Sequence, residues 1–423
     1  MKRLTTIVLM FFAGTAFGQG TVAYRTFFSE HLNQTRSLNV YLPQGYDPSG
    51  TTRYPVIYFL HGWGGNQASY WYVLRPTLDA LIGSGAIEPV IMVTPNGDAA
   101  PYNGSMWTNS ALYGPFEDYV TEDVVSFIDS SYLTKAWPNA RSLLGHSMGA
   151  IGAMTIGLSH PEVFGALAAH SGYFNWDRAR EDLRDAVLAE NTGPPYDFQY
   201  GGVTYTSLMF LFAGGYSPNL ENPPWYVDYP FDQQGDVVED VINRWVAHNP
   251  DVLASALPPV AYPDIFFDCG DQDDLFNFVT NLDLAAAFDA MGVPYQFRPF
   301  QGGHDLTAER LEFSLAFLDE AMHALTSVRD SALTQGVVLE LYSSQPNPVG
   351  ESTDIRFLAP SSGHAILRVY DVRGCLLETL LNGDVSAGEH ILQWRPRQVA
   401  AGIYLLELTS AGHRATQKIM VSH

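Results

Sequence analysis

Continuous apolar segments alternate with helix-like segments through the first three quarters of the chain, and this alternation constrains the fold most strongly. Apolar runs of this kind suit strands that are buried on both faces of a parallel sheet. Their alternation with helices predicts an α/β fold with a mostly parallel, doubly wound sheet. The expected strands are Tyr54–Leu60, Val90–Thr94, Ser142–Leu144, Ile265–Asp268 and Gln296–Pro299, and the expected helices are Asp118–Ser130, Ser147–Ser159, Thr280–Met291 and Leu306–His323.

Two stretches depart from this alternation and divide the chain into regions. Residues 173–263 form a long stretch rich in proline and aromatic residues, which is typical of an insertion over a binding site; a satellite hydrophobic cluster is the alternative. A linker is expected over 327–341. Short alternating strands follow over 342–423 and predict a small all-β, immunoglobulin-like sandwich behind an α/β domain at 19–326.

The first 18 residues have the pattern of a secretory signal peptide. Lys2 and Arg3 provide a positive start, Ile7–Phe12 is an apolar core, and Ala16-Phe17-Gly18 is a small-x-small cleavage site before Gln19. The apolar core is too short to span a bilayer, and no later segment is long and apolar enough. We therefore expect an exported protein, secreted or held at the cell surface, with no membrane span.

The segment Gly145-His146-Ser147-Met148-Gly149 has the G-x-S-x-G pattern at the junction of an expected strand and an expected helix. In this context the pattern predicts a nucleophile elbow, in which a strained turn exposes the serine. Side chains at either glycine would collide with the neighbouring strand or helix. The pattern alone also arises by chance, but its setting predicts that Ser147 is a catalytic nucleophile.

A serine nucleophile needs a base, and position along the chain selects one among the 12 histidines. His304 lies in a glycine-containing loop after the last expected strand and before the last expected helix, where the base of such a fold belongs. His146 is in the elbow itself and should point away from the serine hydroxyl, and His61 should shape the first glycine loop. No motif surrounds four others, for which surface or capping roles are expected: His160, His170, His248 and His323.

The acid that orients the base should follow the preceding strand. Asp271, Asp273 and Asp274 all lie in the turn after that strand. We choose Asp273, with Asp274 as the second choice. The remaining carboxylates are expected to be solvated or to cap the next helix.

Two backbone amides should form an oxyanion hole for the tetrahedral intermediate. One belongs to Met148, the residue after the nucleophile. The other is expected in the glycine-rich segment 60–65, directly after a strand, and we choose Trp63; a simple tight turn is the alternative. No P-loop, dinucleotide fingerprint or metal-ligand spacing occurs, so neither a cofactor nor a metal is expected.

Charge is unevenly placed along the 423 residues, whose net formal charge is −23. Residues 342–423 carry seven basic and seven acidic side chains, whereas residues 19–341 carry 13 basic and 38 acidic ones, a net of −25. Such an acidic body repels nucleic acid and anionic membranes, which favours a neutral partner such as a small-molecule or glycan-linked ester; solubility alone is the alternative. The two cysteines, Cys269 and Cys375, lie far apart and exclude a disulfide framework.

Together these residues resemble the esterase D-like putative esterase family of α/β hydrolases, which includes S-formylglutathione hydrolases, feruloyl esterases, enterochelin esterases and mycolyltransferases. The resemblance covers the chain from Tyr24 to Leu325. It implies an α/β-hydrolase fold, Asp273 as the acid because the family's C-G-x-x-D pattern ends there, and the Trp63 and Met148 amides as the oxyanion hole. The matching segments are 54–62, 107–110, 116–119, 145–149, 269–273 and 303–304.

The C-terminal region resembles a second known module. It is similar to the C-terminal sorting domains of type IX secretion and also to FlgD-like immunoglobulin modules, and the sequence leaves both open. Either resemblance implies a location outside the cytoplasm, and the first implies the secretion machinery as a partner. The matching segments are 345–348, 369–374, 387–390, 402–405 and 418–421.

These features predict a secreted serine esterase. Ser147 would attack an ester carbonyl while His304 takes its proton and Asp273 orients the imidazole. Acyl transfer to an alcohol uses the same residues and is one alternative; a non-catalytic surface binding protein on the same scaffold is another. The long insertion departs from familiar relatives and leaves the ester open, with Trp107 and Trp225 expected to contact it.

Overall fold

The computed structural model describes residues 18–422 apart from 192–193, 195, 197, 199–203, 258–261, 336–338, 343, 345–346, 360–361, 372–375, 387, 397–398 and 411–412. All but the last residue of the expected signal peptide, and also Cys375, lie outside the described residues. The chain divides into two compact units, Met1–Glu320 and Ala321–His423. Each unit has a hydrophobic core of its own.

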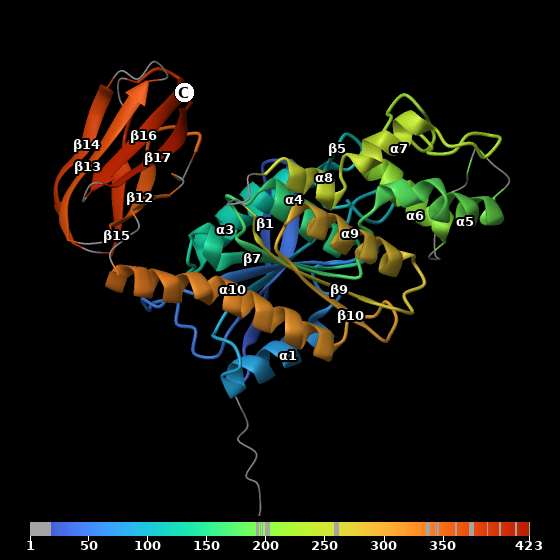
Figure 1. Ribbon diagram of the computed structural model, residues 1–423, viewed down its shortest axis with the longest axis horizontal. Coiled ribbons are helices and arrows are strands. Elements are labelled where there is room, and N and C mark those ends of the chain that lie inside the picture. The colour runs from blue at the N-terminus through green and yellow to red at the C-terminus, as the bar shows by residue number, and fades with distance from the viewer. Residues whose placement is uncertain are drawn as a thin grey trace, which may run out of the picture. The chain divides into compact units, whose positions relative to one another are not determined.

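An eight-stranded sheet forms the centre of the first unit, in the order β1-β2-β4-β3-β7-β8-β9-β10 (Figure 1). β2 pairs antiparallel with both β1 and β4, and all other neighbours are parallel. Every residue of β3, β4, β7 and β8 is buried, which is why the central strands contain apolar runs. The strands are β1 Thr21–Ser29, β2 Gln34–Leu42, β3 Val56–Leu60, β4 Ile91–Pro95, β7 Arg141–His146, β8 Ala166–His170, β9 Asp264–Gly270 and β10 Gln296–Phe300, with a small hairpin of β5 Asn109–Ser110 and β6 Gly114–Pro115.

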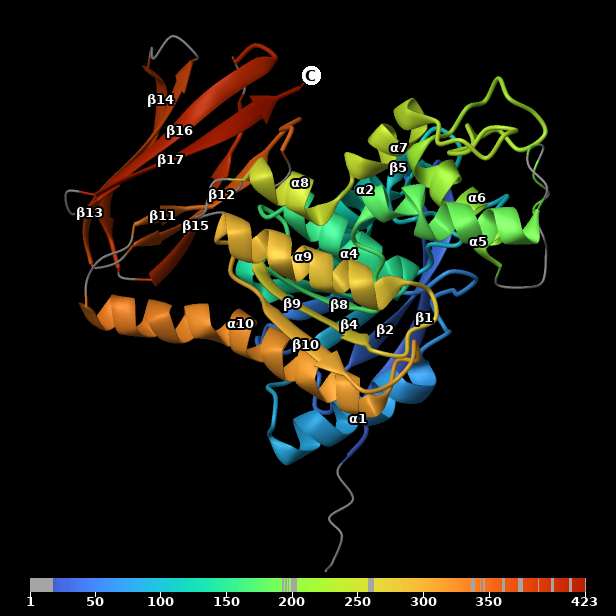
Figure 2. The ribbon, with the colours of Figure 1, turned by 45° about the vertical axis from the view of Figure 1, so that its right-hand side comes forward.

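Helices cover both faces of this sheet, as a doubly wound fold requires. In both ribbon views α1 and the first half of α10 lie against one face, whereas α4 and α9 lie against the other (Figures 1 and 2). The helices are α1 Trp71–Ser84, α2 Phe116–Asp118, α3 Val125–Ser131, α4 Met148–Ser159, α5 Asp182–Glu190, α6 Tyr205–Tyr216, α7 Glu239–Val246, α8 Pro250–Ser255, α9 Asn277–Met291 and α10 Ala308–Gln335, with a π-helical turn, Tyr119–Val124, joining α2 to α3.

The predicted α/β fold is confirmed, and all five strands predicted in this unit are present with shifted ends. Three sheet strands were not expected, namely β1, β2 and β8. β8 has the sequence Ala-Leu-Ala-Ala-His, whose alanines favour helices in isolation, and only burial between β7 and β9 makes it a strand. β1 is an edge strand with few buried residues, so it lacks the apolar run that marks its neighbours.

The stretch that interrupts the alternation, 173–263, is largely helical where it is described. It contains α5, α6, α7 and α8 and a 3₁₀ turn, Trp176–Arg180. Its aromatic rings form a packed cluster in which Trp176 contacts Phe212, Tyr216 and Trp245 edge to face. This cluster belongs to the main core and gives the insertion a fixed shape above the sheet.

The second unit contains two antiparallel sheets, in the orders β11-β12-β15 and β14-β13-β16-β17. Phe357 and Trp394 from the first sheet and Leu367 and Leu406 from the second belong to one buried cluster, so the unit is a β-sandwich as predicted. The expected linker at 327–341 differs from the structure, because α10 continues to Gln335. The strands are β11 Glu340–Leu341, β12 Thr353–Ala359, β13 Gly363–Asp371, β14 Leu376–Val385, β15 Gly388–Trp394, β16 Gly402–Ser410 and β17 His413–Val421.

Candidate active site

Ser147 lies in a sharp turn between β7 and α4. Its backbone has φ 58° and ψ −120°, a conformation that costs a non-glycine residue energy and persists only where its surroundings enforce it. The surroundings are close backbone contacts: a Cβ on Gly145 would lie 1.9 Å from the Gly149 carbonyl oxygen, and one on Gly149 would lie 1.9 Å from that of Leu60. Both flanking positions therefore require glycine, and the expected elbow geometry is present.

Asp273 and His304 meet at the adjacent end of the sheet. Asp273 follows β9 and His304 follows β10, and the Nδ1 atom of His304 lies 2.8 Å from the Oδ2 atom of Asp273. The backbone N–H of Leu275 donates to the other carboxylate oxygen at 3.0 Å. Burial by itself raises the pKa of the Asp273 carboxyl, but His304 and these hydrogen bonds outweigh it and lower that pKa, so the group is a carboxylate at neutral pH.

Of the other two carboxylates in this turn, neither faces His304. Asp271 accepts a hydrogen bond from the backbone N–H of Gly302 at 3.1 Å, which ties the two loops together. Asp274 is exposed, and its carbonyl oxygen accepts a hydrogen bond from the Tyr205 hydroxyl. The geometry therefore favours the first choice of acid over the second.

Asn277, the first residue of α9, is a member of the site that the sequence did not indicate. Its Nδ2 atom lies 3.2 and 3.3 Å from the two carboxylate oxygens of Asp273 and 3.4 Å from Nδ1 of His304. The preceding residue, Phe276, has φ 61°, and this left-handed conformation turns the chain into the helix beside the carboxylate. An Asn four residues after an Asp is too common a pattern to mark such a role.

Contacts of neighbouring residues place Ser147 and His304 in the same region of the structure. The ring of His146, next to the serine, lies 4.8 Å from the ring of His304, centroid to centroid. Ser147 and Asn277 line the same cavity, and Asn277 contacts both Asp273 and His304. The structure thus gathers the three residues at the carboxyl ends of β7, β9 and β10, the edge where sites of open α/β sheets form.

The glycine loop after β3 packs directly against the elbow. A Cβ on Gly62 would lie 3.2 Å from Cβ of Ser147, closer than most carbon contacts, so a glycine here favours this approach. Next to it, Trp63 is anchored by its indole N–H, which donates to the Tyr102 carbonyl at 2.6 Å. Met148 is the first residue of α4, where a backbone N–H has no acceptor inside the helix. Both residues chosen for the oxyanion hole therefore lie beside Ser147.

His61 holds this loop in place. Its Nε2 atom accepts a hydrogen bond from the Gly97 N–H at 2.9 Å, and its Nδ1 atom donates to the Gly62 carbonyl at 2.8 Å. Burial lowers the pKa of His61 to about 4, so the ring is neutral and can fill both roles.

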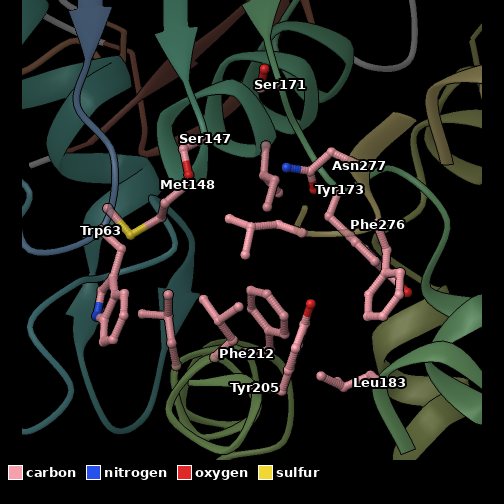
Figure 3. Close-up of a pocket in the computed structure, with 14 residues that line it drawn as sticks. Trp63, Ser147, Met148, Ser171, Tyr173, Leu183, Tyr205, Phe212, Phe276 and Asn277 are labelled. Atoms are coloured by element: carbon pink, nitrogen blue, oxygen red, sulfur yellow. The ribbon is translucent and has the colours of Figure 1, made fainter. Parts of the chain in front are cut away.

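A cavity opens beside Ser147 and is lined mainly by apolar side chains. In Figure 3, Ser147, Met148 and Trp63 lie on one side of it, and Phe276 and Leu183 lie on the other. Apolar walls of this kind suit the apolar part of a small organic molecule. Six of the lining residues come from the insertion: Tyr173, Leu183, Tyr205, Leu208, Leu211 and Phe212.

The two tryptophans expected to contact substrate do not line this cavity. Trp107 is fully buried in the core, where its indole N–H donates to the His61 carbonyl at 3.1 Å and its ring packs edge to face on His61. Trp225 packs on Phe210, and its carbonyl accepts a hydrogen bond from Tyr102. Trp107 therefore stabilises the glycine loop by packing on His61, and Trp225 stabilises the insertion by packing on Phe210.

Within the described residues, no group of three or more His, Cys, Asp or Glu side chains is arranged to hold a metal ion. Among the same residues, no helix combines the length and apolarity that crossing a bilayer requires. Cys269 is buried in β9, and burial raises the pKa of its thiol, as expected of an unreactive core cysteine.

Comparison with known proteins identifies a family that matches the first unit. Residues 29–323, more than half of the chain, match the family model described as "Putative esterase". The chain belongs to the putative esterase family. The chain also resembles a solved ferulic acid esterase, with 22% identity and a TM-score of 0.51 over 72% of this chain and 99% of the other, which shows a shared fold.

Among curated proteins, the chain is 36% identical over 160 residues to an endo-1,4-beta-xylanase/feruloyl esterase of Xylanibacter ruminicola, covering 36% of this chain and 22% of that protein. It is 38% identical over 108 residues to endo-1,4-beta-xylanase Y of Acetivibrio thermocellus, covering 25% of this chain and 9% of that protein. The esterase thus aligns with less than a quarter of the length of either relative.

The second unit matches a different family model. Residues 343–422 correspond to a secretion system C-terminal sorting domain, the first of the two modules that the sequence resembles. The protein is accordingly secreted or held at the cell surface.

Proposed function

We propose that this protein hydrolyses carboxylic esters, with Ser147 as nucleophile, His304 as base and Asp273 as the acid that orients the base. The observation that carries this proposal is the 2.8 Å contact between His304 Nδ1 and Asp273 at the same sheet edge as an elbow serine with left-handed φ. Membership of the putative esterase family supports it.

The reaction proceeds in two halves. His304 takes the Ser147 hydroxyl proton as the oxygen attacks the ester carbonyl, and the Trp63 and Met148 amides stabilise the resulting oxyanion. The intermediate then collapses, the alcohol leaves with the proton held by His304, and the acyl group remains on Ser147. Water, activated by the same imidazole, releases the acid. The Asp273 carboxylate stabilises the imidazolium that forms in each half.

The cavity determines which ester fits. Its walls are mainly apolar and include five aromatic rings, so it suits a bulky apolar acyl group rather than a charged one. Export and the acidic body, net −25 over residues 19–341, fit a neutral substrate outside the cell, such as an acyl group carried on a glycan. We therefore propose esters of bulky apolar acids, including glycan-linked ones, as the substrates.

A two-part experiment tests the proposal. A fluorophosphonate probe should label the wild-type protein and should not label Ser147→Ala, whereas Ser159→Ala, at the exposed end of α4, should label normally. Turnover should be measured on feruloyl, acetyl-xylan and short p-nitrophenyl esters, with and without an added alcohol. Absence of both labelling and turnover would indicate a binding protein, and ester products formed with the alcohol would indicate acyl transfer.

A further inference from the structure

The backbone carbonyl of His304 accepts hydrogen bonds from two buried side chains. The Nε2 atom of His146 lies 2.7 Å from this oxygen, and the Nη1 atom of Arg310 lies 3.2 Å from it. His146 adjoins Ser147 in the elbow, and Arg310 is in the first turn of α10. The peptide of the proposed base is thus held by one donor from the nucleophile turn and one from the helix that follows the base.

The protonation of His146 is fixed by its two partners. A carbonyl oxygen only accepts, so Nε2 must carry the hydrogen that it shares with His304. The Nδ1 atom then accepts from the Tyr70 hydroxyl, 2.9 Å away. Burial, and next the charge of His304, hold the pKa of His146 well below the usual histidine value, so the ring is neutral and keeps this tautomer.

Arg310 is held just as firmly. Its side chain is buried and donates to both carboxylate oxygens of Asp268, at 2.6 and 3.2 Å, and to the Ser171 hydroxyl at 2.9 Å. Its remaining nitrogen donates to the carbonyls of His304 and Asp305. A charged donor in a fixed fork of this kind defines the positions of its acceptors more sharply than a flexible one.

Asp268 is anchored in turn. It lies inside β9, and its Oδ1 atom is 2.8 Å from Nδ1 of His170, whose Nε2 atom contacts the Ser314 hydroxyl at 3.0 Å. All of these side chains are buried. Asp268, the charged acceptor of Arg310, is therefore linked by hydrogen bonds to β8 and α10 as well as to its own strand, β9. These contacts fix the orientation of the Arg310 guanidinium.

We propose that His146 and Arg310 are positioning residues that fix the main chain of His304, and thereby the distance between the base and Ser147. This inference rests on the proposed function. Neither residue contacts the reacting atoms. Their effect comes through geometry, because a shift of about 1 Å in a reacting group can lower the rate about 100-fold.

A double-mutant cycle tests the proposal on the full chain. His146→Phe keeps a flat ring and removes the N–H, and Arg310→Met keeps the length and removes the donors. In the wild-type background, each should lower kcat about 100-fold with little change in KM. In a His304→Ala background, neither should lower the residual rate further, because there is no longer a base to position. His248→Phe, a histidine stacked on Tyr216 outside the site, is the matched control and should leave kcat unchanged.

Conservative variants separate positioning from general damage. Arg310→Lys and His146→Gln each keep a donor and should recover part of the lost kcat. If His146→Phe fails to fold, Tyr70→Phe tests the same contact by removing only the hydroxyl that fixes the His146 tautomer, and its loss should likewise vanish without His304.

Two results would overturn the inference: a further loss of similar size in the His304→Ala background, or an effect confined to KM. The proposed function has its own readout in the same experiment, because the His304→Ala variant alone would keep wild-type turnover if the base were misassigned.

Discussion

The Nδ1 atom of His304 lies 2.8 Å from Oδ2 of Asp273, and the two side chains differ in exposure: the carboxylate is fully enclosed, whereas 22% of the imidazole surface is accessible. Because Nδ1 is engaged by the carboxylate, Nε2 is the nitrogen that remains for a serine hydroxyl. The Asp273 side of the pair is therefore enclosed by protein, whereas the His304 ring remains accessible to a reacting group.

Removing the charge of Asp273 should impair turnover far more than removing that of its neighbours. In Asp273→Asn the side chain no longer stabilises the imidazolium, and kcat should fall about 10³-fold or more. Asp271→Asn and Asp274→Asn leave the contact with His304 intact and should stay within about threefold of wild type. Steady-state kinetics on one p-nitrophenyl ester compares the three, and an equal or greater loss in Asp274→Asn would refute the assignment.

The sequence locates the turn that contains the three aspartates but does not determine which of them contacts His304. The order of strand, turn and helix is enough to locate the turn that carries the acid, because each element has its own apolar period. Within the turn, however, the direction of each side chain depends on backbone dihedrals that residue types do not fix. The family's C-G-x-x-D pattern selects Asp273, and the structure shows that Asp271 contacts Gly302 instead.

Asn277 should act on the rate through the carboxylate that it contacts. Asn277→Ala removes the amide that lies 3.2 and 3.3 Å from the oxygens of Asp273, and kcat should fall about 10-fold, equivalent to about 1.4 kcal/mol. Asn277→Asp should be more harmful, because a second carboxylate there repels the first. Paired measurements of kcat and KM on the same ester provide the check; full activity in Asn277→Asp would contradict the contact.

Narrowing the cavity should change which esters are cleaved. Leu208 lies on α6 and lines the cavity, so Leu208→Trp should lower kcat/KM for a feruloyl ester about 100-fold while an acetyl ester is cleaved almost as before. Leu220→Trp is the control, because Leu220 belongs to the same insertion but is exposed. A parallel loss on both esters would mean that the acyl group binds elsewhere.

Asp268 should make stability depend on pH in the acid range. Burial raises the pKa of its carboxyl, but His170 and the Arg310 guanidinium outweigh burial and lower that pKa. The unfolded chain therefore binds this proton at higher pH than the folded chain does. The stabilisation is complete above about pH 4, the value for an unperturbed Asp, and is lost as pH falls from there through the folded-state pKa.

Urea unfolding of wild type and Asp268→Asn measures this effect. The free energies of unfolding should differ by a constant amount, about 3 kcal/mol, in the neutral range, because the substitution leaves Arg310 buried without its counter-charge. Below about pH 4 the difference should shrink. A difference that persists unchanged at the lowest pH at which the wild type folds would mean that Asp268 is not ionised in the native state.

The role of a buried histidine is a second feature that the sequence does not predict. A lone histidine without a motif predicts a surface or capping role, and for His170 this is wrong: the side chain is fully buried in β8 and bonds Asp268 and Ser314. Its partners come from β9 and α10, which are far away along the chain. Local patterns carry no information about such pairings, whereas the G-x-S-x-G motif and the order of the elements are enough to select Ser147 and His304 as candidates.

The cavity and the proposed triad come from different parts of the chain. Ser147, Asp273 and His304 follow strands of the central sheet, whereas six of the residues that enclose the cavity lie between Tyr173 and Phe212. Exchanging this one contiguous stretch should therefore change which ester the cavity accepts, while Ser147, Asp273 and His304 stay in place on the sheet.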